Sequence, residues 1–176
     1  MIFVTVGTHE QQFNRLLEEM DRLVEKGIIK EEVFIQTGFS TYEPKHCKWS
    51  KLISYKDMDK MVKEARIVIT HGGPASFIAP LQIGKIPIVV PRQFEFDEHV
   101  NNHQLEFAKE VSERMGTIIP IFDIKDLQKN IVNYEKIAKK MNNENSSNNK
   151  KFCKRFEEIV EELIGDWSEI KKLDKI

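Results

Sequence analysis

"RIVITHGGPASFIAP", residues 66–80, contains the local signals that decide the fold. The apolar run at 66–70 is typical of a buried strand, and Pro74 suits the first turn of a helix, where its missing N–H removes a donor without a partner. Gly72 and Gly73 separate the two elements, and glycine lets another group approach the backbone closely. We therefore predict a strand, a tight turn and a helix over 74–83, with a group packed against the turn.

The rest of the chain repeats this alternation of strand and helix. Further apolar runs typical of strands occupy residues 2–6, 33–37, 51–55, 86–90 and 117–121. Amphipathic stretches predict helices over 13–24, 57–65, 101–115 and 124–141, the first ending before Gly27. Most strands are apolar on both faces, as in a sheet covered by helices. We therefore predict an α/β fold with a doubly wound, mostly parallel sheet.

The domain organisation follows from one polar stretch near the end of the chain. Residues 1–141 are predicted to form one domain, and "NNENSSNN" at 142–149 is predicted to be a flexible linker. Residues 150–176 carry an apolar stripe on a charged C-terminal amphipathic helix. That helix either folds back on its own domain, which is the commoner arrangement, or docks a partner.

Composition excludes several classes of protein. The 27 basic and 28 acidic residues nearly cancel, so no basic excess indicates nucleic-acid binding. The apolar runs are too short to cross a bilayer, and the N-terminal residues lack the pattern of a secretory signal. Cys47 and Cys153 lie far apart and form no metal or redox motif. We expect a cytoplasmic protein.

Two glycine loops are the first candidate binding elements, because ligands of doubly wound sheets bind beyond the carboxyl ends of the strands. Gly7-Thr8-His9 follows the first strand, and the segment 71–76 follows the strand at 66–70. A helix beginning at Pro74 would direct unpaired N–H groups and a partial positive charge outward, which favours phosphate. The alternative is that both loops only permit tight turns, since neither matches a dinucleotide or phosphate-loop motif.

A polar cluster after the strand at 86–90 is the second candidate. It comprises Arg92, Glu98, His99, Asn102, His103 and Gln104. This mixture of carboxylate, amide and imidazole suits hydrogen bonding to a polyhydroxylated ligand. Two alternatives remain: His99 and His103, four residues apart, could share a helix face as metal ligands, or the segment is a solvated helix start.

Five segments together resemble the C-terminal, donor-binding half of GT-B glycosyltransferases, which has a Rossmann-like fold. They are "FVTVGTHEQQFNRL", "SYKDM", "ITHGGPASF", "GKIPIVVPR" and "EHVNNHQ", and the likeness runs from Met1 to about Ile121. The chain is most similar to the small bacterial β-1,4-galactosyltransferase subunits of capsular and exopolysaccharide synthesis. It is also similar to the catalytic subunit of the eukaryotic two-part GlcNAc transferase of the dolichol pathway.

The resemblance implies roles for individual residues. Those implied to face the diphosphate are Gly7, Thr8, His71, Gly72, Gly73 and Ser76. Tyr55 falls in the loop implied to hold the uracil, and Glu98 and His99 in the pair implied to contact the donor sugar, with Asn102 and Gln104 behind them.

The chain departs from the pattern of these relatives at two places. Ala79 stands where many of them carry a glutamate that binds the ribose, and Gln82 is a candidate substitute. Pro80 follows and is expected to kink the helix, because it removes a backbone hydrogen bond. "GKIP" also holds one residue more than the "GKP" of many relatives.

The implied reaction is the inverting transfer of galactose from UDP-galactose to a lipid-linked sugar, without a metal ion or other cofactor. His9 is the local candidate for general base, although the base could come from a partner. The implied partner is a membrane-anchored, acceptor-binding subunit that holds the protein at the inner face of the cell membrane. Two other functions are considered: a non-catalytic nucleotide-sugar-binding module that activates a partner enzyme, and a metal-dependent hydrolase using His71, His99 and His103.

Overall fold

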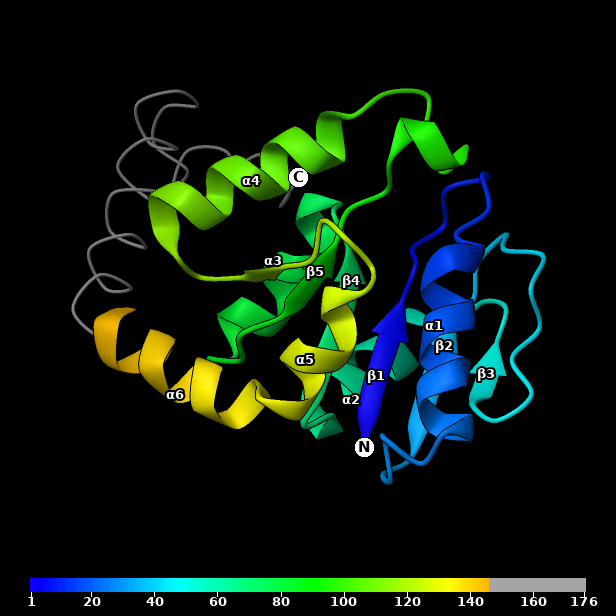
Figure 1. The fold of residues 1–176 in the computed structure, drawn as a ribbon, viewed down its shortest axis with the longest axis horizontal. Coiled ribbons are helices and arrows are strands. Elements are labelled where there is room, and N and C mark those ends of the chain that lie inside the picture. The colour runs from blue at the N-terminus through cyan, green and yellow to red at the C-terminus, as the bar shows by residue number, and fades with distance from the viewer. Residues whose placement is uncertain (146–176) are drawn as a thin grey trace, which may run out of the picture. The chain divides into compact units, whose positions relative to one another are not determined.

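The computed structural model describes residues 1–145 and contains one six-stranded sheet (Figure 1). The strands are β1 (Ile2–Thr5), β2 (Val33–Gln36), β3 (Lys48–Ser50), β4 (Ile67–His71), β5 (Ile88–Val90) and β6 (Ile119–Pro120). The helices are α1 (Asn14–Glu25), α2 (Tyr55–Glu64), α3 (Pro74–Gln82), the 3-10 turn η1 (Phe94–Phe96), α4 (His103–Met115), α5 (Asp126–Val132) and α6 (Tyr134–Asn145).

The sheet is parallel throughout, in the order β3-β2-β1-β4-β5-β6. Thr5, the last residue of β1, pairs with Gln36 of β2 on one side and with Thr70 of β4 on the other. The order reverses between β1 and β4, so the chain continues from these two strands to opposite faces of the sheet, and the switch point between them is the usual place for a ligand. The predicted doubly wound α/β fold is confirmed.

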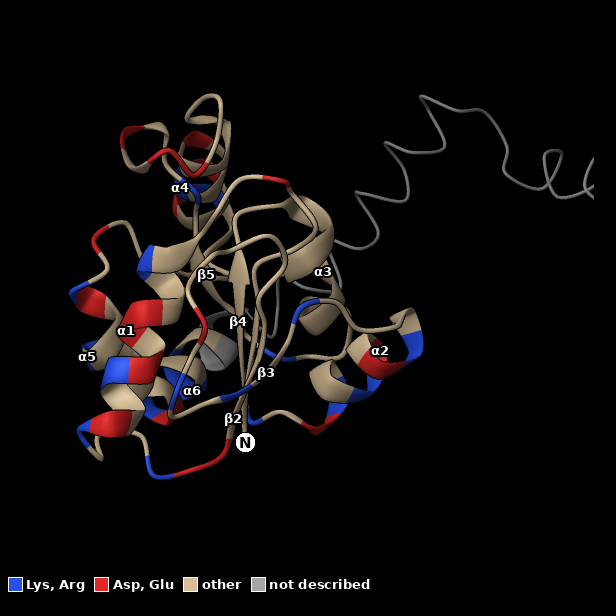
Figure 2. Cartoon of the chain, turned by 90° about the vertical axis from the view of Figure 1, so that its right-hand side faces the viewer, with Lys and Arg blue, Asp and Glu red and all other residues tan. Residues whose placement is uncertain are grey.

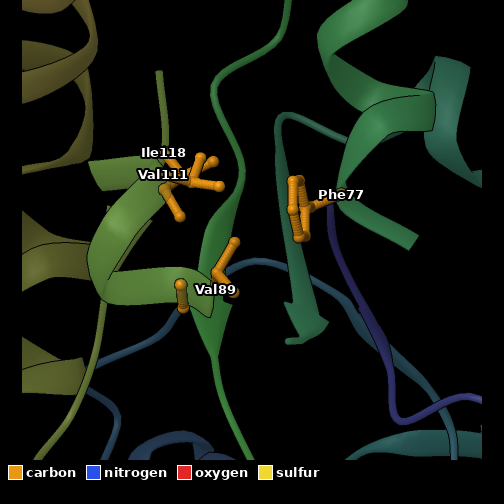
Figure 3. Packing of buried hydrophobic residues seen from close by; sticks show 5 residues of the cluster. Phe77, Val89, Val111 and Ile118 are labelled. Atoms are coloured by element: carbon orange, nitrogen blue, oxygen red, sulfur yellow. The ribbon is translucent and has the colours of Figure 1, made fainter. Parts of the chain in front are cut away.

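Helices cover both faces of the sheet, with α1 and α5 on one face and α2 and α3 on the other (Figure 2). Phe77 of α3 packs with Val89 of β5, with Val111 of α4 and with Ile118, which ties the helices after β4 and β5 together (Figure 3). All four residues of β1 are buried, as the apolar pattern predicts for a central strand. This packing gives the loops at the sheet edge a rigid base.

The structure corrects the sequence prediction most clearly for one strand and one helix. The strand predicted over 51–55 lies at Lys48–Ser50 instead, and Tyr55 begins α2, because the Ser54 hydroxyl accepts a hydrogen bond from the Asp57 amide and caps that helix. The helix predicted over 124–141 is two helices, α5 and α6, which are separated at Asn133.

The end of the described chain bears on the predicted linker. Helix α6 continues through Asn145, four residues into the segment predicted to be flexible, while the rest of that linker and the predicted helix 150–176 lie outside the described residues. Residues Met1–Ala138 form one compact unit. Across the portion that is described, no helix has the length and apolar character needed to cross a membrane.

Candidate functional site

The imidazole of His71 fills the space between the two glycine loops. A Cβ atom added to Gly73 would lie 2.4 Å from His71 Nε2, and one added to Gly7 would lie 2.6 Å from His71 Cε1. Gly7 also has a φ of +76°, a conformation that L side chains rarely adopt. The group predicted to pack against the glycine turn is therefore the side chain of His71, which belongs to the protein itself.

Gly72 has a different structural reason to be glycine. A Cβ atom at this position would lie 2.9 Å from the Cβ of Gln104 and 3.1 Å from the Cβ of Pro91. Gly72 thus lets the first turn of α4 and the end of β5 approach the loop after β4. Its predicted contact with the diphosphate gains no support from this packing, which explains the glycine by the close approach of other elements.

The N-terminus of α3 points out of this glycine turn. Gly73 is the N-cap residue, without a side chain to accept the first helical amides, and Pro74 is the first residue of the helix. Ser76 lies in the first turn, and its hydroxyl is 3.5 Å from His71 Nε2. Helix α3 carries no charged side chain (Figure 2), so the partial positive charge of its N-terminus is not offset within the helix. These groups form a candidate anion site.

His71 is neutral at physiological pH. Burial, together with the positive charge of Arg92, lowers its pKa to about 4, against an opposing contribution from the Thr5 backbone. A neutral imidazole offers one N–H, so His71 can donate one hydrogen bond. His71 therefore contributes a dipole to the site rather than a positive charge.

The protonation of His71 gives a prediction for stability against pH. The pKa of His71 in the folded state lies below the ordinary value of 6.5, so on acidification the unfolded chain binds a proton before the folded protein does. The free energy of unfolding is therefore highest above about pH 6.5 and decreases toward pH 4. Between pH 7 and pH 5 we expect a loss of about 2 kcal/mol from this residue. Urea unfolding at the two pH values, with NMR titration of the imidazole, measures it. The exposed His46 is the reference, and titration of His71 near pH 6.5 would contradict the assignment.

Gln36 is a site residue that the sequence analysis missed. Its side chain accepts hydrogen bonds from the Gly7 amide (3.2 Å) and the Thr5 hydroxyl (2.7 Å), and donates to the carbonyls of Gly7 (2.9 Å) and Lys51 (3.1 Å). Gln36 thus joins the loops after β1 and β3. Because the Gly7 amide already has partners, the exposed Thr8 is the member of this pair that remains open to a ligand. The feature of the sequence that could have indicated Gln36 is a polar residue at the end of the apolar run "VFIQ".

Arg92, which is predicted to bind substrate, lies inside the loop framework in this structure. The residue is fully buried, and Nη1 donates to the carbonyls of Gln11, Gln12 and Glu98 while Nη2 donates to that of Val6, at 2.9–3.0 Å. Its guanidinium also lies over the Phe13 ring, 4.8 Å from the centroid. Arg92 therefore fastens the β1–α1 loop to the loop after β5. Burial lowers its pKa to about 10, against the raising effect of Glu98, so it is charged at neutral pH.

Glu98, which is predicted to contact the donor sugar, is likewise buried in this structure. Its carboxylate forms a two-pronged ion pair with Arg15 of α1, at 2.8 and 2.9 Å, and also accepts the Gln93 amide at 3.0 Å. These three hydrogen bonds hold the carboxylate inside the protein. Glu98 acts with Arg92 as a structural link between two loops that are some 80 residues apart in the chain.

The remaining residues of this cluster divide between the surface and the loop framework. His99 stacks on His9, with ring centroids 4.7 Å apart and planes at 18°. Asn102 accepts the Phe94 amide at 2.9 Å, and Gln104 accepts the Arg92 amide at 3.3 Å. The oxygen of each amide side chain thus supports the loop.

The pairing of His99 and His103 on one helix face is wrong, because α4 begins at His103 and His99 lies in the preceding loop. Among the described residues, no three His, Cys, Asp or Glu side chains are placed to hold a metal ion. The ligand set of the hydrolase alternative is therefore not assembled.

Two further features lie at the same edge of the sheet. Tyr55, implied to lie in the uracil loop, is 88% exposed at the start of α2, and Gln36 ties the loop that precedes it to Gly7 through Lys51. An open groove runs along the first half of α1, lined by Gln12, Asn14, Arg15, Glu18, Glu19, Arg22, Phe96, Asp97, Glu98 and Ile124. Its arginines pair with its own glutamates, so it lacks the free positive charge that a diphosphate would need.

Comparison with known proteins agrees with this architecture. Two crystal structures are similar: the glycotransferase of kitacinnamycin (16% identity, TM-score 0.54, 80% of this chain and 36% of that one) and the glycosyltransferase SnogD from Streptomyces nogalater (14% identity, TM-score 0.50, 82% and 39%). The TM-scores show that the fold is shared, and the chain spans little more than a third of either structure. No curated protein matches the sequence.

The family model described as "Glycosyltransferase family 28 C-terminal domain" matches residues 1–163. The match covers both glycine loops, the Arg92–Glu98 link and every strand of the sheet. The chain therefore belongs to the family of glycosyltransferase family 28 C-terminal domains.

Proposed function

We propose that this chain is the donor-binding part of a glycosyltransferase and binds the diphosphate of a nucleotide sugar between Thr8 and the first turn of α3. One observation carries the proposal: the loops after β1 and β4 meet at the switch point of the sheet, where an uncapped and uncharged helix N-terminus lies beside Ser76 and His71. That combination suits an anion. Family membership supports a sugar nucleotide as the anion's source.

The donor that we propose is UDP-galactose, and the product a β-1,4-linked galactose on a lipid-linked sugar in capsular or exopolysaccharide synthesis. This choice rests on the resemblance of the sequence segments quoted above. As the bond between the sugar and the diphosphate breaks, negative charge grows on the leaving UDP. Donors fixed at the start of α3 stabilise that charge more than they stabilise the intact donor, which lowers the barrier.

We further propose that a membrane-anchored partner subunit supplies the acceptor-binding half. The family model is that of a C-terminal domain, and the chain corresponds to only 36% and 39% of the two similar glycosyltransferase structures. Acceptor binding in such an arrangement falls to residues outside this chain. The protein would then work at the inner membrane surface through its partner.

Calorimetric titration of the chain with UDP, UDP-galactose and UDP-GlcNAc, with and without EDTA, tests the donor site. We expect metal-independent binding of UDP that UDP-galactose strengthens. Ser76→Ala should weaken UDP binding about tenfold, because a hydrogen bond to a charged phosphate is lost. Ser112→Ala, the same change on α4, is the matched control and should leave the affinity unchanged.

Each outcome bears on a different part of the proposal. Equal UDP affinity in the wild type and Ser76→Ala would contradict the placement of the diphosphate at the start of α3. Tighter binding of UDP-GlcNAc than of UDP-galactose would change the proposed donor sugar and would still support the proposed binding site. Binding without turnover, measured with the partner present, would favour the non-catalytic module.

A further inference from the structure

The His9 side chain is held by contacts on two sides at the edge of the glycine loops. Its ring is stacked on that of His99, and its Nε2 lies 2.8 Å from Gln11 Oε1. The charges of His9 and His99 each act on His71, which places all three imidazoles in one electrostatic neighbourhood beside the candidate anion site. The orientation of His9 therefore matters for any chemistry at this edge.

The Gln11 side chain decides which nitrogen of His9 carries hydrogen. Gln11 Nε2 donates to the carbonyl of Asp97 at 3.5 Å, so Oε1 is the atom that faces His9. Turning the amide round would set two oxygen acceptors against each other, because Oε1 would then meet the Asp97 carbonyl. An amide oxygen only accepts, so His9 Nε2 must be the donor. A neutral imidazole with hydrogen on Nε2 has its free lone pair on Nδ1.

The atoms that orient Gln11 are themselves fixed. The Gln11 carbonyl accepts from Arg92 Nη1 at 2.9 Å, and the same nitrogen holds the carbonyl of Glu98, next to Asp97. Asp97 has a φ of 55°, and it is the one residue other than glycine with a positive φ in the described part of the chain. Strained backbone of this kind persists where surrounding contacts hold it, often at functional sites. Here it turns the Asp97 carbonyl toward Gln11.

We propose that Gln11 is a positioning residue that holds His9 with hydrogen on Nε2, so that Nδ1 is the atom that takes the proton of the acceptor hydroxyl, while the stacked His99 fixes the plane of the ring. This inference rests on the proposed function. In the transfer step the hydroxyl proton passes to His9 Nδ1, and the hydroxyl oxygen forms a bond to the anomeric carbon. The bond from that carbon to the diphosphate breaks, and its electron pair leaves with UDP.

Nitrogen-15 NMR of the whole chain, labelled at histidine, reads the tautomer without an activity assay. In the wild type above the pKa of the ring, His9 Nε2 should carry the hydrogen, and on acidification Nδ1 should be the nitrogen that gains a proton. Gln11→Leu should lower the ratio of Nε2–H to Nδ1–H by about tenfold, because one hydrogen bond selects between the two forms. Gln11→Glu keeps an acceptor at the same place and should restore the wild-type tautomer.

The exposed His46 is the internal control, since its tautomer should be the same in all three proteins. Hydrogen on Nδ1 of His9 in the wild type, or an unchanged ratio in Gln11→Leu, would overturn the inference. Calorimetry of the same proteins with UDP separates this failure from failure of the donor site. Gln11→Leu should bind UDP as the wild type does, whereas loss of UDP binding in the wild type itself would count against the proposed function and leave the tautomer result standing.

Discussion

Replacing Arg92 with methionine should lower the free energy of unfolding by about 3–5 kcal/mol, the usual cost of removing one member of a buried charged network. Methionine fills a similar volume but donates no hydrogen bond. Four backbone carbonyls, those of Val6, Gln11, Gln12 and Glu98, would each lose a charged donor inside the protein. Urea unfolding measures the loss, and a thermal scan should show a decrease in Tm of about 10 °C.

Arg114→Met is the matched control for this prediction. Arg114 is exposed on α4 and pairs with Glu110 one turn earlier, so its replacement should change stability by less than about 0.5 kcal/mol. Arg92→Lys retains the charge but has one nitrogen in place of a fork, and should fall between the wild type and Arg92→Met. If Arg92→Met were as stable as Arg114→Met, the guanidinium would not be what holds the two loops together.

Gly73→Ala should abolish most nucleotide binding, with an expected loss of UDP affinity of about 100-fold. The backbone of Gly73 has φ −73° and ψ 128°, which alanine adopts readily before proline, so the effect is steric and not torsional. The new methyl group would lie 2.4 Å from His71 Nε2, and the ring has no room to retreat because Gly7 lies against its other side. Displacing His71 and the start of α3 together removes more than one contact with the charged diphosphate.

Gly84→Ala separates this effect from a general loss of stability. Gly84 follows the other end of α3 with φ +76°, so alanine there costs about 1 kcal/mol in backbone strain, yet no atom lies within 4 Å of the new methyl group. Its UDP affinity should equal that of the wild type. Combining Gly73→Ala with His71→Ala removes the clashing ring and should recover thermal stability. Calorimetry and thermal scans of the set would refute the steric explanation if the double variant were no more stable than Gly73→Ala.

The binding loops show how far local patterns reach. The two turns could be predicted from Gly7, Gly73 and Pro74. The backbone freedom of glycine and the missing N–H of proline are properties of single residues, so they are visible in the sequence. The structural reason for glycine at positions 7 and 73 differs in part from the prediction. The space next to both residues holds the ring of His71, which belongs to β4. The histidine ring occupies this space in the structure, and the phosphate that we propose would lie at the start of α3.

The polar cluster after β5 shows where local patterns stop. Arg92 and Glu98 look in sequence like residues for a sugar, since arginine and glutamate are mostly exposed in proteins. In the fold both are buried, and each has partners within the first fifteen residues of the chain, far away in the sequence. Gln36 was missed for the same reason: its function is to join Gly7 to Lys51, and neither contact is visible from its neighbours in sequence.

The sequence by itself determined the strand and helix alternation, the parallel doubly wound sheet and the two turns at its switch point, because hydrophobic period, glycine and proline act within a few residues. The tertiary structure alone decided which polar side chains face a ligand and which hold the loops. That choice depends on burial and on partners about 80 residues away, as for Arg92 with Gln11 and Glu98 with Arg15. A side chain that is buried and bonded to the protein's own groups is turned away from a substrate, and only the assembled fold shows which side chains these are.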